Sequence, residues 1–448
     1  MTHQNSFFGY PDSLAGAIIA FEEIEGGVSI INAPTGCKFV PGSIVDSQDI
    51  RTDGVNPFEY QDEFYFGQPR VPCTYLDEID YVHGSHEKLK RLLVILEKKG
   101  HQIIGIVNGP GTALIGDNLR GIADEVGINV PVFLVEESSF DGTTPQGYAK
   151  SMVQVFDYAI KNISNTSENQ NSLAITGINL LNFRWKDNID QLRSELAIAG
   201  IEDVVFAGAG ASLEDINRAT SAQYICPANE VYGRSVAKAL TARNTACEYI
   251  DGLLDPVGLQ ASEKWLTEIA LRTSGNIEAL RARFKDIRKT LYTHISRFTS
   301  RMGFPEGLTC YISADESLVA PLMLYVFDYL GIYPSAIYIH QRAEASGRFI
   351  KQFIKERQLK TKIEYQLIPL EEAELIRKVR PDIVFGSSHT LVIASEALGY
   401  TVPFVPVAYP NQGTVYLVPR PVMGLGGTLV LTENILNAIV RLSRTAIF

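Results

Sequence analysis

The chain has 448 residues, of which 46% are hydrophobic and 20% are charged, and its formal net charge is −11. This much apolar material can fill more than one core, and domains of about 100–200 residues predict two or three here. The acidic balance argues against nucleic acid as a partner, and the lack of a long apolar run or a signal-peptide pattern predicts a cytoplasmic protein with no membrane contact.

Short apolar runs rich in Val, Ile and Tyr alternate with helical patterns along most of the chain. Such nearly continuous runs are typical of parallel strands covered on both faces. Leucines at i, i+3, i+4 and i+7 from Leu89 predict a helix that stops near Gly100. Apolar residues with helical spacing in 115–126 predict another helix, which stops at Gly127. The predicted strands are 102–109, 131–137, 172–181, 203–210, 222–227, 308–315, 335–340, 363–369 and 382–388.

Two segments predict domain boundaries. Residues 161–172 are polar without apolar periodicity, and residues 302–308 interrupt a helical stretch before a new strand begins. The repetition of strand and helix predicts doubly wound α/β domains. We therefore expect three of them, at 1–165, 172–300 and 305–448.

Several common catalytic motifs do not occur. The sequence has no GxxxxGK[ST] loop, so it should not bind ATP by a Walker A mechanism, and it has no HExxH, paired CxxC or GxSxG. The glycine-rich segment 108–119 follows a predicted strand and opens a helix, where backbone N–H groups can hold an anion. Tight turning between strand and helix is the simpler explanation of its glycines, and the one we favour.

The chain has five cysteines, and in a cytoplasmic protein they do not predict a disulfide framework. Cys37 and Cys73 are flanked by Pro or Gly, which predicts loops. Loop cysteines beside backbone N–H donors suit thiolate ligands of iron. Two copies of the chain in a symmetric dimer would supply four thiolates. Cys247 and Cys310 lie in core patterns and receive no role.

The sequence resembles the nitrogenase component 1 superfamily over nearly its whole length. The segment that begins CTYLDEIDYVHGSHEKL at Cys73 resembles the part of the family that carries a cluster cysteine, and the Gly-Cys pair at Cys37 resembles the first cluster cysteine. The order and spacing of the segments together carry the resemblance. The other similar segments are 108–126, 206–226, 249–270, 285–340, 380–389 and 420–427.

The resemblance implies three Rossmann-like domains with doubly wound parallel sheets around a central cleft. It implies an iron–sulfur cluster at a subunit interface, and a separate iron-protein-like ATPase that delivers electrons to it. The family includes nitrogenase subunits, cofactor-assembly relatives, light-independent protochlorophyllide and chlorophyllide reductases, and a nickel tetrapyrrole cyclase. The partner in the dimer is either a second copy or a paralogous chain.

Departures from the family pattern select among its branches. The third cysteine position holds Gly109, Pro110 or Gly111, so we do not expect an eight-iron cluster. We expect instead a 4Fe–4S cluster that is held by Cys37 and Cys73 from two subunits. Residues 404–417 contain no histidine for a nitrogenase-type cofactor, so we do not predict dinitrogen reduction. Cys226 lies near the family's cofactor cysteine. It is interpreted either as a ligand of a second metal cofactor or, more simply, as a buried thiol.

Further cleft residues are expected where strands end, because doubly wound domains bind ligands there. His340 and His389 follow predicted strands and are candidate proton donors, although a lone histidine at a strand end is more often a structural group. Arg420 is a candidate carboxylate ligand. Gln146 and Gly147 loosely match a family loop that lines the cleft.

These features favour a reductase component that takes electrons through an interface cluster to a substrate or cofactor in the cleft. The alternative is a scaffold on which a metallocluster is assembled and handed on. A plain small-molecule binding protein is the third hypothesis, and it leaves the two loop cysteines unexplained.

Overall fold

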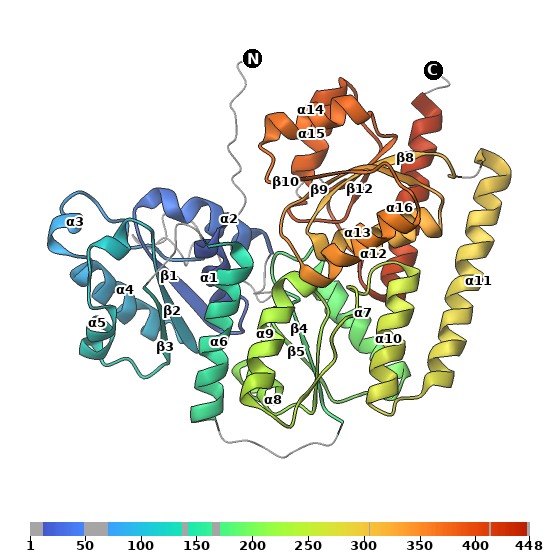
Figure 1. The fold of residues 1–448 in the computed structure, drawn as a ribbon. Helices are drawn as coiled ribbons and strands as arrows, with labels where there is room; N and C mark the ends of the chain where they lie inside the picture. The colour runs from blue at the N-terminus through green and yellow to red at the C-terminus, as the bar shows by residue number, and fades with distance from the viewer. Residues whose placement is uncertain are drawn as a thin grey trace. The chain divides into compact units, whose positions relative to one another are not determined.

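The structure is a computed structural model that describes residues 12–48, 70–136, 142–163, 171–303, 305–411 and 414–445. Its strands form three sheets, and every strand pairing within them is parallel (Figure 1). Contacts divide the chain into two compact units, 1–164 with 208–217, and 165–207 with 218–448.

The first unit contains the sheet β1-β2-β3. Residues 208–217 belong to it, because the N–H of Glu25 donates to the carbonyl of Ala211 (2.9 Å) and that of Gly210 donates to the carbonyl of Glu23 (2.8 Å). The elements of residues 12–163 are α1 (Ser13–Glu22), β1 (Gly27–Asn32), η1 (Thr35–Lys38), α2 (Phe39–Gln48), α3 (Asp80–His83), α4 (His86–Lys98), β2 (Ile103–Asn108), η3 (Thr112–Leu114), α5 (Leu119–Val126), β3 (Val132–Val135) and α6 (Thr144–Asn162).

The core of this unit follows from its sequence patterns. Every residue of β1 and β2 is buried, as continuous apolar runs require in a sheet covered on both faces. The leucines of α4 that predicted a helical face are fully buried, and they pack with Ile104 and Ile106 of β2. On another side, α1 crosses α6 so closely that a Cβ on Gly147 would lie 2.0 Å from the carbonyl oxygen of Ser13.

The second unit holds the other two sheets. The sheet β5-β4-β6-β7 comes first in the chain, and the helices around it include α10 and the long α11. Its elements are β4 (Leu173–Thr176), α7 (Trp185–Ile198), β5 (Val204–Ala207), α8 (Leu213–Thr220), β6 (Tyr224–Pro227), α9 (Glu230–Arg243), β7 (Glu248–Tyr249), α10 (Leu259–Arg272) and α11 (Ile277–Met302); the first half of α8 falls in the first unit.

The third sheet has the order β10-β9-β8-β11-β12. The C-terminal helix α16 returns from it to pack on α7, α10 and α11, and so joins the two sheets of this unit. The elements are β8 (Thr309–Ala314), α12 (Glu316–Asp328), β9 (Tyr333–Ile339), α13 (Glu344–Glu356), β10 (Lys362–Tyr365), α14 (Pro369–Val379), β11 (Ile383–Gly386), α15 (Ser388–Leu398), β12 (Phe404–Pro406) and α16 (Gly424–Thr445).

Each strand that the sequence predicted overlaps a strand of the structure, and the α/β fold with parallel sheets is confirmed. The predicted helix stops are also confirmed: α4 ends just before Gly100 (φ 76°), and α5 ends at Gly127 (φ 68°). The division into three domains and the central cleft stay predictions. Most of the predicted linker 161–172 lies outside the described residues.

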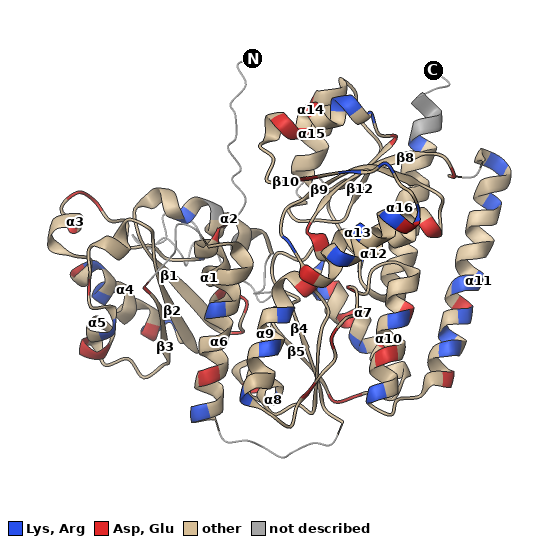
Figure 2. Cartoon of the chain, in the orientation of Figure 1, with Lys and Arg blue, Asp and Glu red and all other residues tan. Residues whose placement is uncertain are grey.

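Charged residues are concentrated on helices and loops (Figure 2). Strands β1 to β6 carry none of them, as expected for strands buried on both faces. Within the described residues, no helix is long and apolar enough to cross a membrane.

Candidate functional site

A polar network closes the carboxyl edge of the first sheet. The side-chain amide of Asn32, the last residue of β1, donates to Asn108 Oδ1 (2.9 Å) and to Ser85 Oγ (3.1 Å). Both the N–H and the Oγ of Ser85 donate to Asp117 Oδ2, each at 2.7 Å. Ser85 and Asp117 lie in two of the segments that resemble the family, so part of that resemblance reflects hydrogen bonds that fix these loops.

Cys37 lies just beyond this edge. It belongs to the single-turn helix η1, which follows β1, and its side chain is half-buried. Burial, and secondly the charge of Asp12, raises the pKa of the Cys37 thiol. Part of this thiol is open to solvent, and the role of Cys37 as a cluster ligand stays a prediction.

Cys73 lies beside β1, where it forms an isolated parallel bridge with Ile31. Its side chain is fully buried; its Sγ donates to the carbonyl of Ala33 (3.2 Å) and accepts the N–H of Tyr75 (3.4 Å). Burial raises the pKa of Cys73 to about 11, and the charge of Cys37 contributes to the rise. Its bond to Ala33 places Cys73 against the segment that carries Cys37, which lies four residues after Ala33.

These two thiols fit an iron–sulfur cluster in donor type and in place. Cys37 is half-buried, Cys73 is hydrogen-bonded to Ala33 four residues before it, and the N–H of Tyr75 donates to the sulfur of Cys73. Hydrogen bonds of this kind are among the features that set the potential of iron–sulfur clusters. Cys73 would have to give up its hydrogen bond to Ala33 on ligation, because its Sγ is buried and occupied.

The position of the family's third cysteine has no room for a side chain at its first residue. A Cβ on Gly109 would lie 2.6 Å from the Cβ of Ala33, closer than real Cβ contacts allow. A Cβ on Gly111 would lie 3.0 Å from the hydroxyl of Tyr81. The glycines of this segment thus permit close packing of two loops, in agreement with the simpler interpretation of the sequence.

His340 and His389 both lie at the carboxyl edge of the third sheet, after β9 and β11, with β8 between those strands. The Nε2 of His340 lies 2.9 Å from Ser313 Oγ. Burial lowers the pKa of His340 to about 3 and also lowers that of His389. Both rings are therefore neutral near pH 7, so a proton that either ring donates would come from a neutral N–H. The role of the two histidines in proton transfer stays a prediction.

Three carboxylates that the sequence did not single out gather in the second unit. Glu230, the first residue of α9, accepts hydrogen bonds from the N–H groups of Ala345 (2.7 Å) and Ser346 (2.9 Å) at the start of α13, and from Ser346 Oγ (2.7 Å). Asp255 accepts the N–H of Glu230 (2.9 Å), and Asp315 precedes α12. Burial raises the pKa of Asp255 well above its usual range and that of Asp315 to about 7.

Asp315→Asn is expected to raise the free energy of unfolding at about pH 8 and to leave it unchanged at about pH 4. The folded pKa of about 7 exceeds the unfolded value of about 3.9. The folded protein therefore binds the proton more tightly, and the stability that the protonated form contributes is lost as the pH rises from about 4 to about 7. Urea unfolding at both pH values measures the change. The control is Asp286→Asn on the exposed face of α11; an Asp315→Asn variant with the pH dependence of the wild type would contradict the prediction.

Cys226 is the penultimate residue of β6 and is fully buried. Its Sγ lies 3.6 Å from the carbonyl of Pro227, and the indole of Trp265 donates to the same carbonyl (3.3 Å). Burial raises the pKa of this thiol. The surroundings are those of a structural thiol, and a metal-ligating role for Cys226 stays a prediction.

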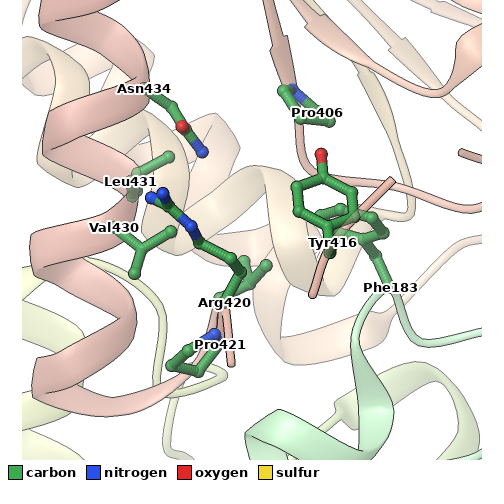
Figure 3. A pocket seen from close by; sticks show the side chains of 9 residues that line it. Phe183, Pro406, Tyr416, Arg420, Pro421, Val430, Leu431 and Asn434 are labelled. Carbon is green, nitrogen blue, oxygen red and sulfur yellow. The ribbon is translucent and has the colours of Figure 1, made fainter. Parts of the chain in front are cut away.

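Arg420 lines a small pocket in the second unit, with an empty volume of about 270 Å³ that includes space open to solvent. Figure 3 shows its guanidinium alongside α16, with Tyr416 on the other side of the pocket. The guanidinium donates to Glu433 Oε1 (2.8 Å), and the N–H of Arg420 donates to Asp187 Oδ2 (2.7 Å). Its charge therefore already has a carboxylate partner.

Gln146 and Gly147 lie in the first turn of α6. The side-chain oxygen of Gln146 accepts the N–H of Thr143 (2.9 Å), which completes a capping box. Gly147 is buried where α6 crosses α1. Both residues have structural contacts in the first unit, and their assignment to a substrate cleft stays a prediction.

The family model for the nitrogenase component 1 type oxidoreductase matches residues 13–440. The chain belongs to this family. The resemblance found in the sequence is thereby confirmed.

Individual relatives of this component 1 family member are distant. It is 22% identical to a nitrogenase molybdenum-iron protein beta chain of Methanococcus maripaludis, over 95% of this chain and 92% of the relative. It is 26% identical to component CfbD of the Ni-sirohydrochlorin a,c-diamide reductive cyclase complex of Methanothermobacter thermautotrophicus, over 28% of this chain and 30% of the relative. It is 24% identical to one of the subunits of light-independent protochlorophyllide reductase of Prochlorococcus marinus, over 45% of this chain and 40% of the relative. The matches to the last two thus span well under half of those proteins.

The solved structure of nitrogenase Cp1 at pH 6.5 has the same fold. The TM-score is 0.75 at 14% sequence identity, and the match covers 98% of this component 1 family member and 95% of that chain. At this identity the likeness concerns the fold alone.

Proposed function

We propose that this protein is the catalytic component of a nitrogenase-like reductase. It would take low-potential electrons from an ATP-hydrolysing iron protein and pass them to a substrate or cofactor. Membership of an oxidoreductase family and distant similarity to two reductase components support this function. The observation that carries it is the placement of Cys37 and Cys73 in the same unit, the first half-buried and the second hydrogen-bonded to Ala33, four residues before the first.

Cys37 and Cys73 are the residues that we propose as ligands of a 4Fe–4S cluster. Each chain supplies two thiolates, so a second copy or a paralogous subunit completes the set of four. As a ligand, Cys73 would give up its bond to Ala33, and the N–H of Tyr75, which now donates to its sulfur, would be a hydrogen-bond donor for the thiolate. A bound cluster of this type supplies one-electron transfer at low potential.

The carboxyl edge of the third sheet is the place that we propose for proton transfer to the substrate, through His340 or His389. Doubly wound sheets bind ligands at this edge, and both rings are held there in the neutral form. Arg420, Gln146 and Gly147 as cleft residues, and Cys226 as a ligand of a second cofactor, rest on the sequence only.

A cluster-assembly scaffold is the second candidate. It is favoured by the small number of ligands, since the third cysteine position is closed by the contact of Gly109 with Ala33. A scaffold would transfer its cluster to an acceptor protein. A reductase would keep its cluster and undergo repeated oxidation and reduction with an iron protein.

The test is the iron and acid-labile sulfide content of protein purified without oxygen, with EPR spectra after dithionite reduction. We expect about two irons and two sulfides per chain, as one 4Fe–4S cluster shared between two chains requires. Cys37→Ala should reduce the iron to background, because it removes the accessible thiolate. The matched control is Cys247→Ala, which removes another half-buried thiol and should leave the iron unchanged.

A folded, anaerobic preparation without iron would refute the reductase and leave the scaffold, which hands its cluster on. Iron that persists in Cys37→Ala would refute the proposed ligand. Transfer of the cluster to an apo acceptor protein, with no repeated reduction of the cluster by an iron protein, would favour the scaffold over the reductase.

A further inference from the structure

A buried serine connects a glutamate to His340 at the carboxyl edge of the third sheet. Ser313 lies in β8 and is fully buried. Its Oγ lies 2.9 Å from Nε2 of His340 and donates to Oε1 of Glu372 (3.1 Å). Glu372 is a buried residue in the first turn of α14. The three side chains therefore form one continuous hydrogen-bonded chain within the second unit.

Tyr311 fixes the glutamate end of this chain. It lies two residues before Ser313 on β8, is fully buried, and its hydroxyl donates to the same oxygen, Oε1 of Glu372, at 2.9 Å. A carboxyl oxygen has two lone pairs, so these two hydroxyl hydrogens occupy both. Burial raises the pKa of Glu372, and a proton on this carboxyl has its place on Oε2, which takes part in neither bond. Ser313 is therefore a donor to Glu372 in either protonation state.

The histidine end of the chain follows from the number of hydrogens. A serine hydroxyl has one hydrogen, and the hydrogen of Ser313 is directed at Glu372. Its oxygen must then accept in the contact with His340, so the hydrogen of that bond belongs to Nε2. Burial lowers the pKa of His340 to about 3, so the ring is neutral near pH 7 and carries one hydrogen only. Nδ1 is then the ring nitrogen that bears a lone pair.

The orientation of the ring is held by its neighbours as well. The backbone N–H of His340 donates to the carbonyl of Ala314 (3.1 Å), and the ring packs edge-on against Tyr338, with centroids 4.8 Å apart. Tyr338 lies opposite Ser313 in the register of β8 and β9. A half-turn of the imidazole about its bond to Cβ would place a carbon at Ser313 and lose the hydrogen bond. The contacts therefore favour one orientation.

We infer that Ser313 and Glu372 are positioning residues that hold His340 with its hydrogen on Nε2, so that Nδ1 is a hydrogen-bond acceptor. The inference rests on the proposed function in one respect, which is that the substrate lies at this edge of the sheet. Whatever contacts Nδ1, whether a protein group or a substrate, must donate a hydrogen to it, so a substrate with an N–H or O–H group fits. The N–H of His340 is directed at Ser313, and the proton that a substrate receives therefore comes from His389 rather than from His340.

The test is the ¹⁵N NMR spectrum of the histidine rings, because a ring nitrogen with a hydrogen and one without differ strongly in chemical shift. The full-length protein has seven histidines, and the signals of His340 are those that His340→Gln removes. Near pH 7 we expect a hydrogen on Nε2 and none on Nδ1. Ser313→Ala removes the acceptor, so the ratio of the Nε2–H form to the Nδ1–H form should fall by about fivefold, the effect of one hydrogen bond.

The matched control is Ser335→Ala. It removes a hydroxyl that donates to the carbonyl of Cys310 (3.0 Å) in the same sheet, and it should leave both signals of His340 in place.

A hydrogen on Nδ1 of His340 in the wild type would overturn the inference, and this spectrum decides the matter even should Ser313→Ala not fold. An unchanged ratio in folded Ser313→Ala would overturn it too. So would a hydrogen that moves from Nε2 to Nδ1 between about pH 8 and about pH 5, because protonated Glu372 would then be the donor to Ser313. The spectrum does not require iron, so folded protein without iron but with the hydrogen on Nε2 would refute the reductase and leave this arrangement of His340 standing.

Discussion

Glu230→Ala is expected to destabilise the second unit by about 3–5 kcal/mol. The carboxylate of Glu230 is buried, and it accepts three hydrogen bonds from the start of α13 as well as one from Arg234 (3.1 Å). Its removal leaves the N–H donors at the start of α13 and the hydroxyl of Ser346 without their acceptor, and α13 loses the anion at its positive end. Urea unfolding followed by tryptophan fluorescence measures the loss, since Trp185 and Trp265 both lie in this unit.

Glu344→Ala is the matched control for this change. Glu344 also pairs with Arg234, at 2.9 Å, but its side chain is 64% exposed. An exposed ion pair contributes at most about 1 kcal/mol, so this variant should remain close to wild type. Equal losses in Glu230→Ala and Glu344→Ala would contradict the view that burial makes the Glu230 carboxylate important.

Gly147→Ala is expected to destabilise the first unit by about 3 kcal/mol or more, at the upper end of overpacking costs. The added Cβ would lie 2.0 Å from the carbonyl oxygen of Ser13 and 2.8 Å from its carbonyl carbon. Both atoms belong to the backbone of α1, so the clash can be relieved only by separating the two helices. Circular dichroism during thermal or urea unfolding measures the loss.

Gly36→Ala provides the comparison within the same unit. No atom lies within 4 Å of a Cβ placed on Gly36, so its replacement should change stability by no more than about 0.5 kcal/mol. A Gly147→Ala variant as stable as Gly36→Ala would show that α1 and α6 do not pack as described.

The α/β fold could be predicted because most strands are continuous apolar runs and several helices have clear periodicity. The elements that escaped prediction lack these signals. Helix α1 is buried at every one of its positions, so its sequence SLAGAIIAFE shows no polar face. Strand β1, GVSIIN, is short and begins with a glycine, and only its pairing with β2 from Gly27↔Ile103 to Asn32↔Asn108 establishes it.

The candidate site was predictable only where chemistry is visible in single residues. Cys37 and Cys73 were found because loop cysteines are unusual, but the hydrogen bond from Cys73 to Ala33 joins residues that are distant in sequence. Glu230 contacts the start of α13 across more than a hundred residues, and no local pattern marks such a pair. The local sequence around Gly147 does not distinguish a glycine that lines a cleft from a glycine that lets two helices cross closely.

The segment 208–217 gives this chain an order of folding that differs from its order of synthesis. Domains usually fold as units while the chain leaves the ribosome, with the N-terminal one first. Here the first unit lacks its last hydrogen-bonded segment until residues beyond β4 and β5 have been made, because Gly210 and Ala211 pair with Glu23 and Glu25. A nascent chain that ends near residue 164 therefore carries an unfinished first unit, and strands of the second unit must emerge before the first can close.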